Sequence, residues 1–431
     1  MLTKSAVVPA LALAATVGLL APGALAEPAG ESRSSRSDAS VITEWNTIAE
    51  RTIYAENATP IPSSSLYFGF VSIAMYDAVV AIEGGYTTYT PQPATHRRAS
   101  SRVAAATAAY LVLSYFFPAS AATLQEDYLK ALSGERKKSR ALAGGVAAGA
   151  AAASGILRSR QNDGIGNPDI LFTTAPAPGV WRPTAPQTAF AVPWLGFVRP
   201  LVIESATQFP QPDRNPLGSA AYATEFEETR THGGADNTDG LERTAKETAT
   251  AMFFSVNVSA QYQAGMQDQV TKRGLGIVES ARAFAILNTS VADTLISCWR
   301  AKYEHPTWRP ITAIREADTD GNDATVADPT WSPLGVNPPY PEFSSGHACY
   351  TGAASNTFDH LFGDGPLDLI LPSLTDPATT REYDSAKDLD TDTMNARVWL
   401  GLHFRSSMTG ANQLGHSVSD WVIAHSFLPV G

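Results

Sequence analysis

The sequence predicts an all-α protein built from two helical-bundle halves. Three observations support this fold class: alanine is very abundant in the first half, runs of β-branched residues are short, and apolar residues recur at steps of three and four along most of the chain. With 431 residues, 44% of them hydrophobic, the chain is long enough to bury more than one domain-sized core.

The N-terminus has the features of a secretory signal peptide over residues 1–26. Lys4 precedes a short apolar stretch, and Ala24-Leu25-Ala26 forms a small-x-small cleavage site. Residues 27–40 are rich in Ser, Arg, Glu and Gly and predict a flexible start of the mature chain. We therefore expect a secreted, extracellular protein with no membrane contact after signal cleavage.

The two halves are predicted at residues 41–217 and 218–431. The first half combines helices with a connection rich in Pro and aromatic residues; the helices are expected at 45–53, 66–82, 102–117, 118–132 and 141–160, and the connection at 162–218. The second half is expected to hold helices at 220–231, 240–254, 259–267, 276–303, 347–362, 383–402 and 408–427, with a loop-rich stretch at 318–344.

Charge and cysteine content narrow the function classes. The net charge of −11 and pI near 5.2 argue against nucleic-acid and membrane-surface partners, so any bound anion must be held by a local basic cluster. Cys298 and Cys349 are too few for a disulfide scaffold or a four-thiolate zinc site. They form either one bridge, which an exported protein permits, or two buried thiols.

Three short stretches place polar or cationic groups where the pattern otherwise predicts core. The first runs from Lys302 to Pro310 and ends in Arg309-Pro310. The second runs from Glu342 to Ala353 and has Ser345-Gly346-His347 at the start of a helix rich in small residues. The third runs from Asn395 to Arg405 and contains Arg397 and His403. Taken singly, each has an ordinary structural explanation: a solvated helix end, a Ser N-cap beside an exposed His, and a buried His bonded to a carbonyl.

Together the three stretches predict a site for a tetrahedral oxyanion. Lys302, Arg309 and Arg397 supply three cations, and Ser345 with the Gly346 N–H supplies neutral donors at a helix N-terminus. Of the two imidazoles, one can bond the central atom from an apical side while the other protonates or deprotonates the opposite apical oxygen. With phosphate this arrangement gives transfer through a phosphohistidine, and with vanadate it gives a stable five-coordinate cofactor.

These stretches resemble the Lys-x6-Arg-Pro, Pro-Ser-Gly-His and Ser-Arg-x5-His motifs shared by vanadium-dependent haloperoxidases and the type 2 phosphatidic acid phosphatase superfamily. The resemblance to the secreted bacterial haloperoxidase branch extends over essentially the whole mature chain, including Trp45–Tyr89, Gly179–Pro183, Trp194–Gln208 and Leu287–Ala317. It implies an all-α, haloperoxidase-like fold.

The resemblance also implies a role for each site residue. Lys302, Arg309, Ser345, Gly346 and Arg397 would bind vanadate, and Lys302 would in addition polarise bound peroxide. His347 would be the acid–base residue, and His403 the covalent ligand of the metal. Hydrogen peroxide and halide would then react through a His-bound peroxovanadate to give hypohalous acid or halogenated organic acceptors.

The chain departs from the family pattern at several positions. Ser344 replaces the Pro of Pro-Ser-Gly-His, Ala396 replaces the Ser before Arg397, and Ser407 stands where many members have Asp after the ligand His. Ala354 occupies a position at which bromoperoxidases resemble one another in having a second His, whereas Tyr340 is similar to an aromatic residue of fungal chloroperoxidases. Neither position fixes the halide.

Two alternatives to a haloperoxidase remain open on the same residues. One is a secreted acid phosphatase, which needs no metal cofactor, and the other is an oxyanion-binding protein without turnover. The expected partners are hydrogen peroxide, halide and an organic acceptor, with a homodimer left open. Residues 318–323 have calcium-loop composition but lack the required Gly and Glu spacing, so we expect a turn there, and His305 is expected at the surface.

Overall fold

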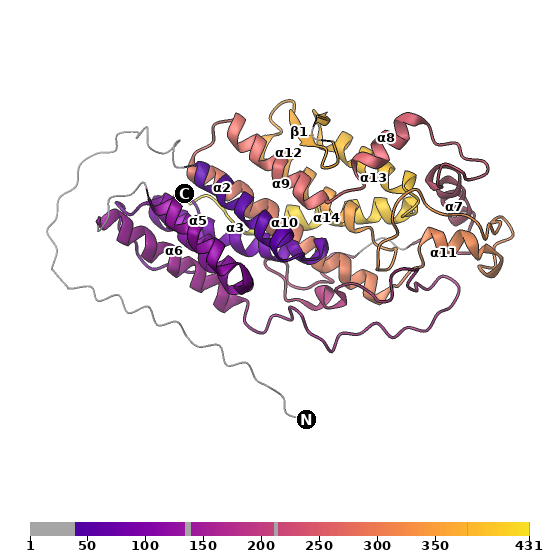
Figure 1. The fold of residues 1–431 in the computed structure, drawn as a ribbon, viewed down its shortest axis with the longest axis horizontal. Helices are drawn as coiled ribbons and strands as arrows, with labels where there is room; N and C mark the ends of the chain where they lie inside the picture. Colours follow the sequence, from indigo (N-terminus) through magenta and orange to yellow (C-terminus); the bar gives the residue numbers. More distant parts are fainter. Residues whose placement is uncertain (1–38, 134–138, 211–213, 377, 431) are drawn as a thin grey trace, which may run out of the picture. The chain divides into compact units, whose positions relative to one another are not determined.

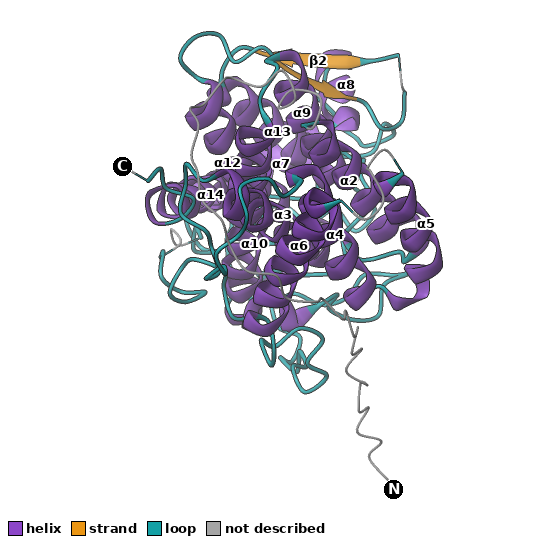
Figure 2. Ribbon diagram, turned by 90° about the vertical axis from the view of Figure 1, so that its left-hand side faces the viewer, coloured by secondary structure: helices purple, strands orange, loops and turns teal. Residues whose placement is uncertain are grey.

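The structure is a computed structural model that describes residues 39–133, 139–210, 214–376 and 378–430. Almost all regular structure in these residues is helical (Figure 2), which confirms the predicted fold class. The signal peptide predicted at residues 1–26 lies outside the described residues, as does nearly all of the predicted flexible segment at 27–40.

The helices of the first half match the predicted segments closely. They are α2 (Ser40–Glu50) with a π-helical continuation (Arg51–Glu56), α3 (Ile61–Glu83), α4 (Ser101–Phe116), a 3₁₀ turn (Pro118–Ser120) leading into α5 (Ala121–Leu132), and α6 (Arg140–Ser159). Local sequence explains where two of them begin, because Ser100 and Ser139 accept hydrogen bonds from the backbone N–H groups of Val103 and Leu142.

The connection and the second half follow. After a 3₁₀ turn (Pro193–Phe197) come α7 (Ala220–Gly233), α8 (Ala245–Phe253), α9 (Val258–Lys272), α10 (Ile277–Glu304), α11 (Pro310–Arg315), a 3₁₀ turn (Ala317–Thr319), α12 (Gly346–Phe362), β1 (Leu369–Pro372), β2 (Thr380–Tyr383), α13 (Ala386–Trp399) and α14 (Arg405–His425).

Some predicted helix starts are wrong by several residues. Helix α3 begins at Ile61 rather than 66. Helix α8 begins at Ala245 rather than 240, because Thr244 and Glu247 form a capping box that fixes its first turn. The segment predicted as helix from Tyr383 begins instead with a strand: β2 pairs with β1 in an antiparallel hairpin in which Tyr383 faces Leu369.

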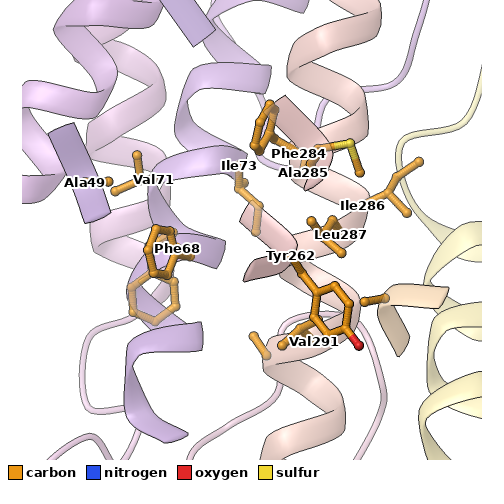
Figure 3. Packing of buried hydrophobic residues seen from close by; sticks show 14 of the residues in the cluster. Ala49, Phe68, Val71, Ile73, Tyr262, Phe284, Ala285, Ile286, Leu287 and Val291 are labelled. Carbon is orange, nitrogen blue, oxygen red and sulfur yellow. The ribbon is translucent and has the colours of Figure 1, made fainter. Parts of the chain in front are cut away.

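Helix α10 is the central element of the fold. It packs against α3 on one side and against α12 and α14 on another (Figures 1 and 2). Nearly all of its residues from Ile277 to Lys302 are buried. Figure 3 shows this packing, in which Phe284, Leu287 and Val291 of α10 lie near Ile73 of α3 and Tyr262 of α9. The division into halves at residue 217 stays a prediction, since α10 joins elements from both.

Helix α3 is apolar enough to be mistaken for a membrane span. By length and composition α3 and α6 could each cross a bilayer, but 89% of the apolar window of α3 is buried inside the protein. For α6 the buried share is 39%. The apolar character of α3 is therefore explained by its position in the core.

Helices α12 and α14 approach each other closely because glycines remove side chains from their contact. A Cβ atom on Gly352 would lie 2.2 Å from the carbonyl oxygen of Asn412, and one on Gly415 would lie 2.5 Å from that of Cys349. Because α12 and α14 begin at residues 346 and 405, their close packing brings the second and third motifs together.

A buried carboxylate fixes helix α13 against the same pair. Asp390 of α13 accepts hydrogen bonds from Ser355 of α12 (2.7 Å) and Asn412 of α14 (2.8 Å), and its other oxygen lies 2.8 Å from His416 Nε2. One side chain thus ties together the three helices that carry Gly346, Arg397 and the segment after His403.

Candidate active site

Lys302 lies in the last turn of α10 and is wholly buried. Its ammonium donates to the carbonyl oxygens of Pro341 (2.7 Å) and Glu342 (3.1 Å), and lies 5.0 Å from the ring centre of Tyr340. Burial, with a further contribution from the positive charge of Arg309, lowers the pKa of Lys302 to about 8. Burial therefore disfavours the charged form of this amine, and a bound anion would stabilise that form.

Arg309 is fixed in place just before Pro310 opens helix α11. Its Nε donates to Tyr340 O (2.9 Å), and its Nη1 donates to Leu402 O (2.8 Å) and lies 3.0 Å from His403 Nε2. Within the described part of the chain its Nη2 is buried with no hydrogen-bond partner. Burial lowers the pKa of Arg309 to about 10.

Arg397 lies in the last turn of α13 and is 3% exposed. Its Nη1 donates to Phe254 O at 3.2 Å, but its Nε has no partner among the described residues. Burial lowers its pKa to about 10. Arg309 and Arg397 each present one buried N–H group whose hydrogen bond is missing, which normally costs about 1–3 kcal/mol.

The start of helix α12 supplies neutral donors. Ser345 is the N-cap residue, and its hydroxyl oxygen accepts from Ala348 N (3.4 Å). Gly346 follows as the first helical residue, and a Cβ there would lie 3.1 Å from the Trp299 ring, which itself packs on Tyr340. The first amides of a 17-residue helix favour a negative charge in front of them.

His403 is buried and is held by a carboxylate. Its Nδ1 lies 2.8 Å from Glu342 Oε1, which also accepts from the backbone N–H of Phe404 (3.1 Å). A carboxylate at Nδ1 places the ring proton there and leaves a lone pair on Nε2, toward which Arg309 donates. Burial and then the charges of Arg309 and Lys302 lower the pKa of His403 well below its usual range, so the ring is neutral.

His347 lies in the first turn of α12 and is partly exposed, unlike the other side chains of this group. Its Nε2 is 3.4 Å from the carbonyl oxygen of Val256. Desolvation and the neighbouring charge of Arg397 lower its pKa well below the usual range. His347 is therefore a neutral imidazole at the solvent side of the cluster, able to accept a proton.

The structure places the three predicted cations and the two imidazoles near one another. Lys302, Arg309 and Arg397 all lower the pKa of both His347 and His403, and the first two share the carbonyl-lined loop at residues 340–342. Three cations face a single carboxylate, so the cluster has an excess of positive charge although the whole chain is acidic.

Glu342 begins the second motif, but the sequence analysis assigned it no role. It is 2% exposed in side-chain terms, and burial raises its pKa to about 7 despite the lowering charges of Arg309 and Lys302. The available signal was an acidic residue between Pro341 and Phe343, three positions before the Ser345 motif, in a stretch with few other charges.

The remaining candidates lie outside the cluster or have structural roles. Cys298 and Cys349 are free buried thiols on either side of Ser344, so the structure has two thiols rather than the bridge that was the other alternative. Asp320 accepts from Asn322 N within a turn, as expected, and His305 is exposed. No group of three metal-ligating His, Cys, Asp or Glu side chains occurs within the described residues.

Residues 282–428, which carry all three motifs, match the family model for the VCPO second helical-bundle domain. This part of the chain is similar to the second helical-bundle domain of vanadium haloperoxidases. A curated relative, vanadium chloroperoxidase of Curvularia inaequalis, is 24% identical over an alignment that covers 31% of this chain and 29% of that protein. The match therefore spans less than a third of the relative's length.

Solved structures of haloperoxidases share the fold over most of the chain. A bacterial vanadium-dependent iodoperoxidase superposes with a TM-score of 0.74 at 21% identity, covering 93% of this chain and 99% of its own. A holo-type bacterial vanadium-dependent chloroperoxidase has a TM-score of 0.64 at 17% identity, covering 84% and 91%. At these identities the superpositions establish the fold, and the chemistry must be argued from the site.

Proposed function

We propose that this protein is a secreted vanadium-dependent haloperoxidase that oxidises halide with hydrogen peroxide, releasing hypohalous acid or halogenating an organic acceptor. The observation that carries the proposal is that two hydrogen-bond donors of the cluster have no acceptor among the described residues. Arg309 Nη2 and Arg397 Nε are buried N–H groups with no partner among the described residues, and both point to a missing acceptor.

The residues present fit vanadate. A tetrahedral oxyanion offers acceptor oxygens to both orphaned guanidinium N–H groups, to Lys302 and to the amides at the start of α12. His403 Nε2, with its ring proton held at Nδ1 by Glu342, is the nitrogen that would bind the metal. Vanadate bound there would supply Lewis-acid activation of hydrogen peroxide toward halide.

The chain's own residues would do the rest. Lys302, Arg309 and Arg397 would neutralise and orient the anion, whose negative charge would offset the burial that lowers their pKa values. His347, neutral and partly exposed, would take the proton that hydrogen peroxide loses on binding and return it to the departing oxygen. The rings of Trp299 and Tyr340 pack against each other beside Lys302, with ring centres 5.5 and 5.0 Å from its ammonium.

The same contacts support a second candidate, an acid phosphatase. A neutral imidazole with a carboxylate on Nδ1 is an activated nucleophile, and His347 could protonate the leaving group. Phosphate and vanadate present the same tetrahedral oxygens, so geometry alone favours neither substrate.

One experiment separates the candidates. The purified mature chain is incubated with orthovanadate and assayed for halogenation of an activated diketone with hydrogen peroxide and, separately, iodide, bromide and chloride. Hydrolysis of nitrophenyl phosphate is measured in parallel without vanadate. We expect vanadate-dependent halogenation with at least one halide; hydrolysis with no halogenation by any of the three would establish the phosphatase instead.

Export is tested separately. If the signal peptide is cleaved after Ala26, the protein recovered from the culture medium of a secreting host should begin at Glu27. N-terminal sequencing measures this directly, and a protein found only inside the cells with Met1 retained would contradict export.

A further inference from the structure

Glu342 forms two separate links between the motifs of the site. Its carboxylate holds His403 Nδ1 at 2.8 Å and the Phe404 N–H at 3.1 Å, while its backbone carbonyl accepts from Lys302 Nζ at 3.1 Å. Residues 302, 342 and 403 come from the end of α10, the loop before α12 and the turn before α14. The buried Glu342 side chain therefore contacts His403, the proposed vanadium ligand, directly.

We propose that Glu342 is the positioning residue for His403, and that the neighbouring position 407 is an alternative place for the acid that holds this imidazole. This inference rests on the proposed function, because it assigns the role of Glu342 toward a His403-bound oxyanion. It concerns the position, tautomer and basicity of the imidazole rather than any contact between Glu342 and the anion.

The physical argument begins with the imidazole. A neutral ring can carry its proton on either nitrogen, and only the Nδ1–H form leaves Nε2 free to act as a ligand or nucleophile. A carboxylate 2.8 Å from Nδ1 selects that form and increases the electron density available at Nε2. The second bond to the Phe404 N–H fixes the carboxylate itself, so the ring has one orientation.

Ser407 supplies the second half of the argument. It lies in the first turn of α14, wholly buried, and its hydroxyl is 3.5 Å from the carbonyl oxygen of Glu342. Its side chain also contributes to the lowering of the Glu342 pKa, so hydroxyl and carboxylate are neighbours. A carboxylate at both positions would place two negative charges in one buried space, which is strongly unfavourable. We therefore expect that one acid, at either of these two neighbouring positions, is enough to hold His403.

The test is a set of variants read by two measurements. The first is the ¹H–¹⁵N correlation spectrum of the His403 ring in the vanadate-free protein, assigned by comparison with His403→Ala. The second is the affinity for orthovanadate, measured by equilibrium dialysis. The variants are Glu342→Ala, the isosteric Glu342→Gln, and Glu342→Ala combined with Ser407→Asp. The matched control combines Glu342→Ala with Ser417→Asp, which adds the same charge to α14 at a site whose hydroxyl donates to Gln413 O of the same helix.

We expect Glu342→Ala to lose the pure Nδ1–H form and to bind vanadate roughly 10–100-fold more weakly, as for other partners of metal-bound histidines. Glu342→Gln should keep the Nδ1–H form, because an amide oxygen still accepts, with a smaller loss of affinity. It also tests the role with the least disturbance of packing, should the alanine variant fold poorly. Ser407→Asp should restore both properties in the Glu342→Ala background, and Ser417→Asp should restore neither.

Wild-type tautomer and affinity in Glu342→Ala would overturn the proposal. Equal behaviour of the two double variants would overturn the claim that positions 342 and 407 share one role. Failure of the proposed function is distinguishable: a wild-type protein that binds no vanadate, but whose Nδ1–H form is lost in Glu342→Ala, would refute the haloperoxidase while supporting the positioning of His403 by Glu342.

Discussion

Replacing Arg397 by methionine should make the anion-free protein more stable while removing much of its response to oxyanions. Arg397 is buried, makes one hydrogen bond at 3.2 Å to Phe254 O, and leaves its Nε without a partner in the described structure. Methionine has a similar length and no polar nitrogen, so it can fill the same space without the uncompensated charge.

The magnitude follows from the pKa of the buried guanidinium. A fall from 12.5 to about 10 means that the protein disfavours the charged form by about 3 kcal/mol, at roughly 1.4 kcal/mol per pKa unit. Loss of van der Waals contacts and of the bond to Phe254 offsets part of this gain. We expect a net stabilisation of about 1–2 kcal/mol, or roughly 1–2 °C in Tm for a chain of 431 residues.

The assay is thermal unfolding followed by circular dichroism, with and without orthovanadate. Saturating vanadate at about 100 times its Kd should stabilise the wild type by about 2.7 kcal/mol, and the Arg397→Met protein by much less at the same concentration. Arg98→Met, a change at an exposed arginine, is the control and should alter neither property. An Arg397→Met protein that is less stable than wild type, yet gains the same stability from vanadate, would refute the reasoning.

Three further predictions concern the site and the helices that carry it. His403→Ala should abolish vanadate retention on a desalting column while His347→Ala retains vanadate and loses most halogenation; equal retention in wild type and His403→Ala would show that the ligand assignment is wrong. The pKa of Lys302 is about 8 in the folded state and 10.5 in the unfolded chain, so between these pH values the unfolded state binds an extra proton. The free energy of unfolding of the wild type should therefore rise with pH across this window, relative to that of Lys302→Met. Denaturant titrations at pH 7.5 and 10.5 measure this difference, and parallel pH profiles of the two proteins would contradict it. Gly352→Ala should cost about 1–3 kcal/mol or more because its Cβ would lie 2.2 Å from Asn412 O, whereas Gly365→Ala, with nothing within 4 Å, should be close to neutral in the same titration.

Local sequence predicts the helices of this fold well. The helical composition of the sequence locates α4 and α6 to within about one residue of their observed bounds, because this signal acts within a few positions. The hairpin of β1 and β2 was missed because each strand has only four residues, and its stability comes from pairing Leu369 with Tyr383 rather than from its own composition.

The site was predictable only in part. Motif spacing placed Lys302, Arg309 and His403 in one cluster, and their contacts in the structure agree with that expectation. The contact between Glu342 and His403 joins residues 61 positions apart, so no local pattern signals it. Whether the N–H groups of Arg309 and Arg397 find an acceptor likewise depends on where the loops place their backbone carbonyls, which only the folded chain determines.

The central claim is that these side chains surround one oxyanion bonded to His403. A crystal of the purified protein soaked in orthovanadate, with vanadium located by its anomalous scattering, tests this most directly. We predict a vanadium atom bonded to His403 Nε2, with oxygens in hydrogen-bond contact with Lys302 Nζ, Arg309 Nη2 and Arg397 Nε. Vanadium bound elsewhere, or a His403 whose Nε2 still lies against Arg309 alone at saturating vanadate, would contradict the account.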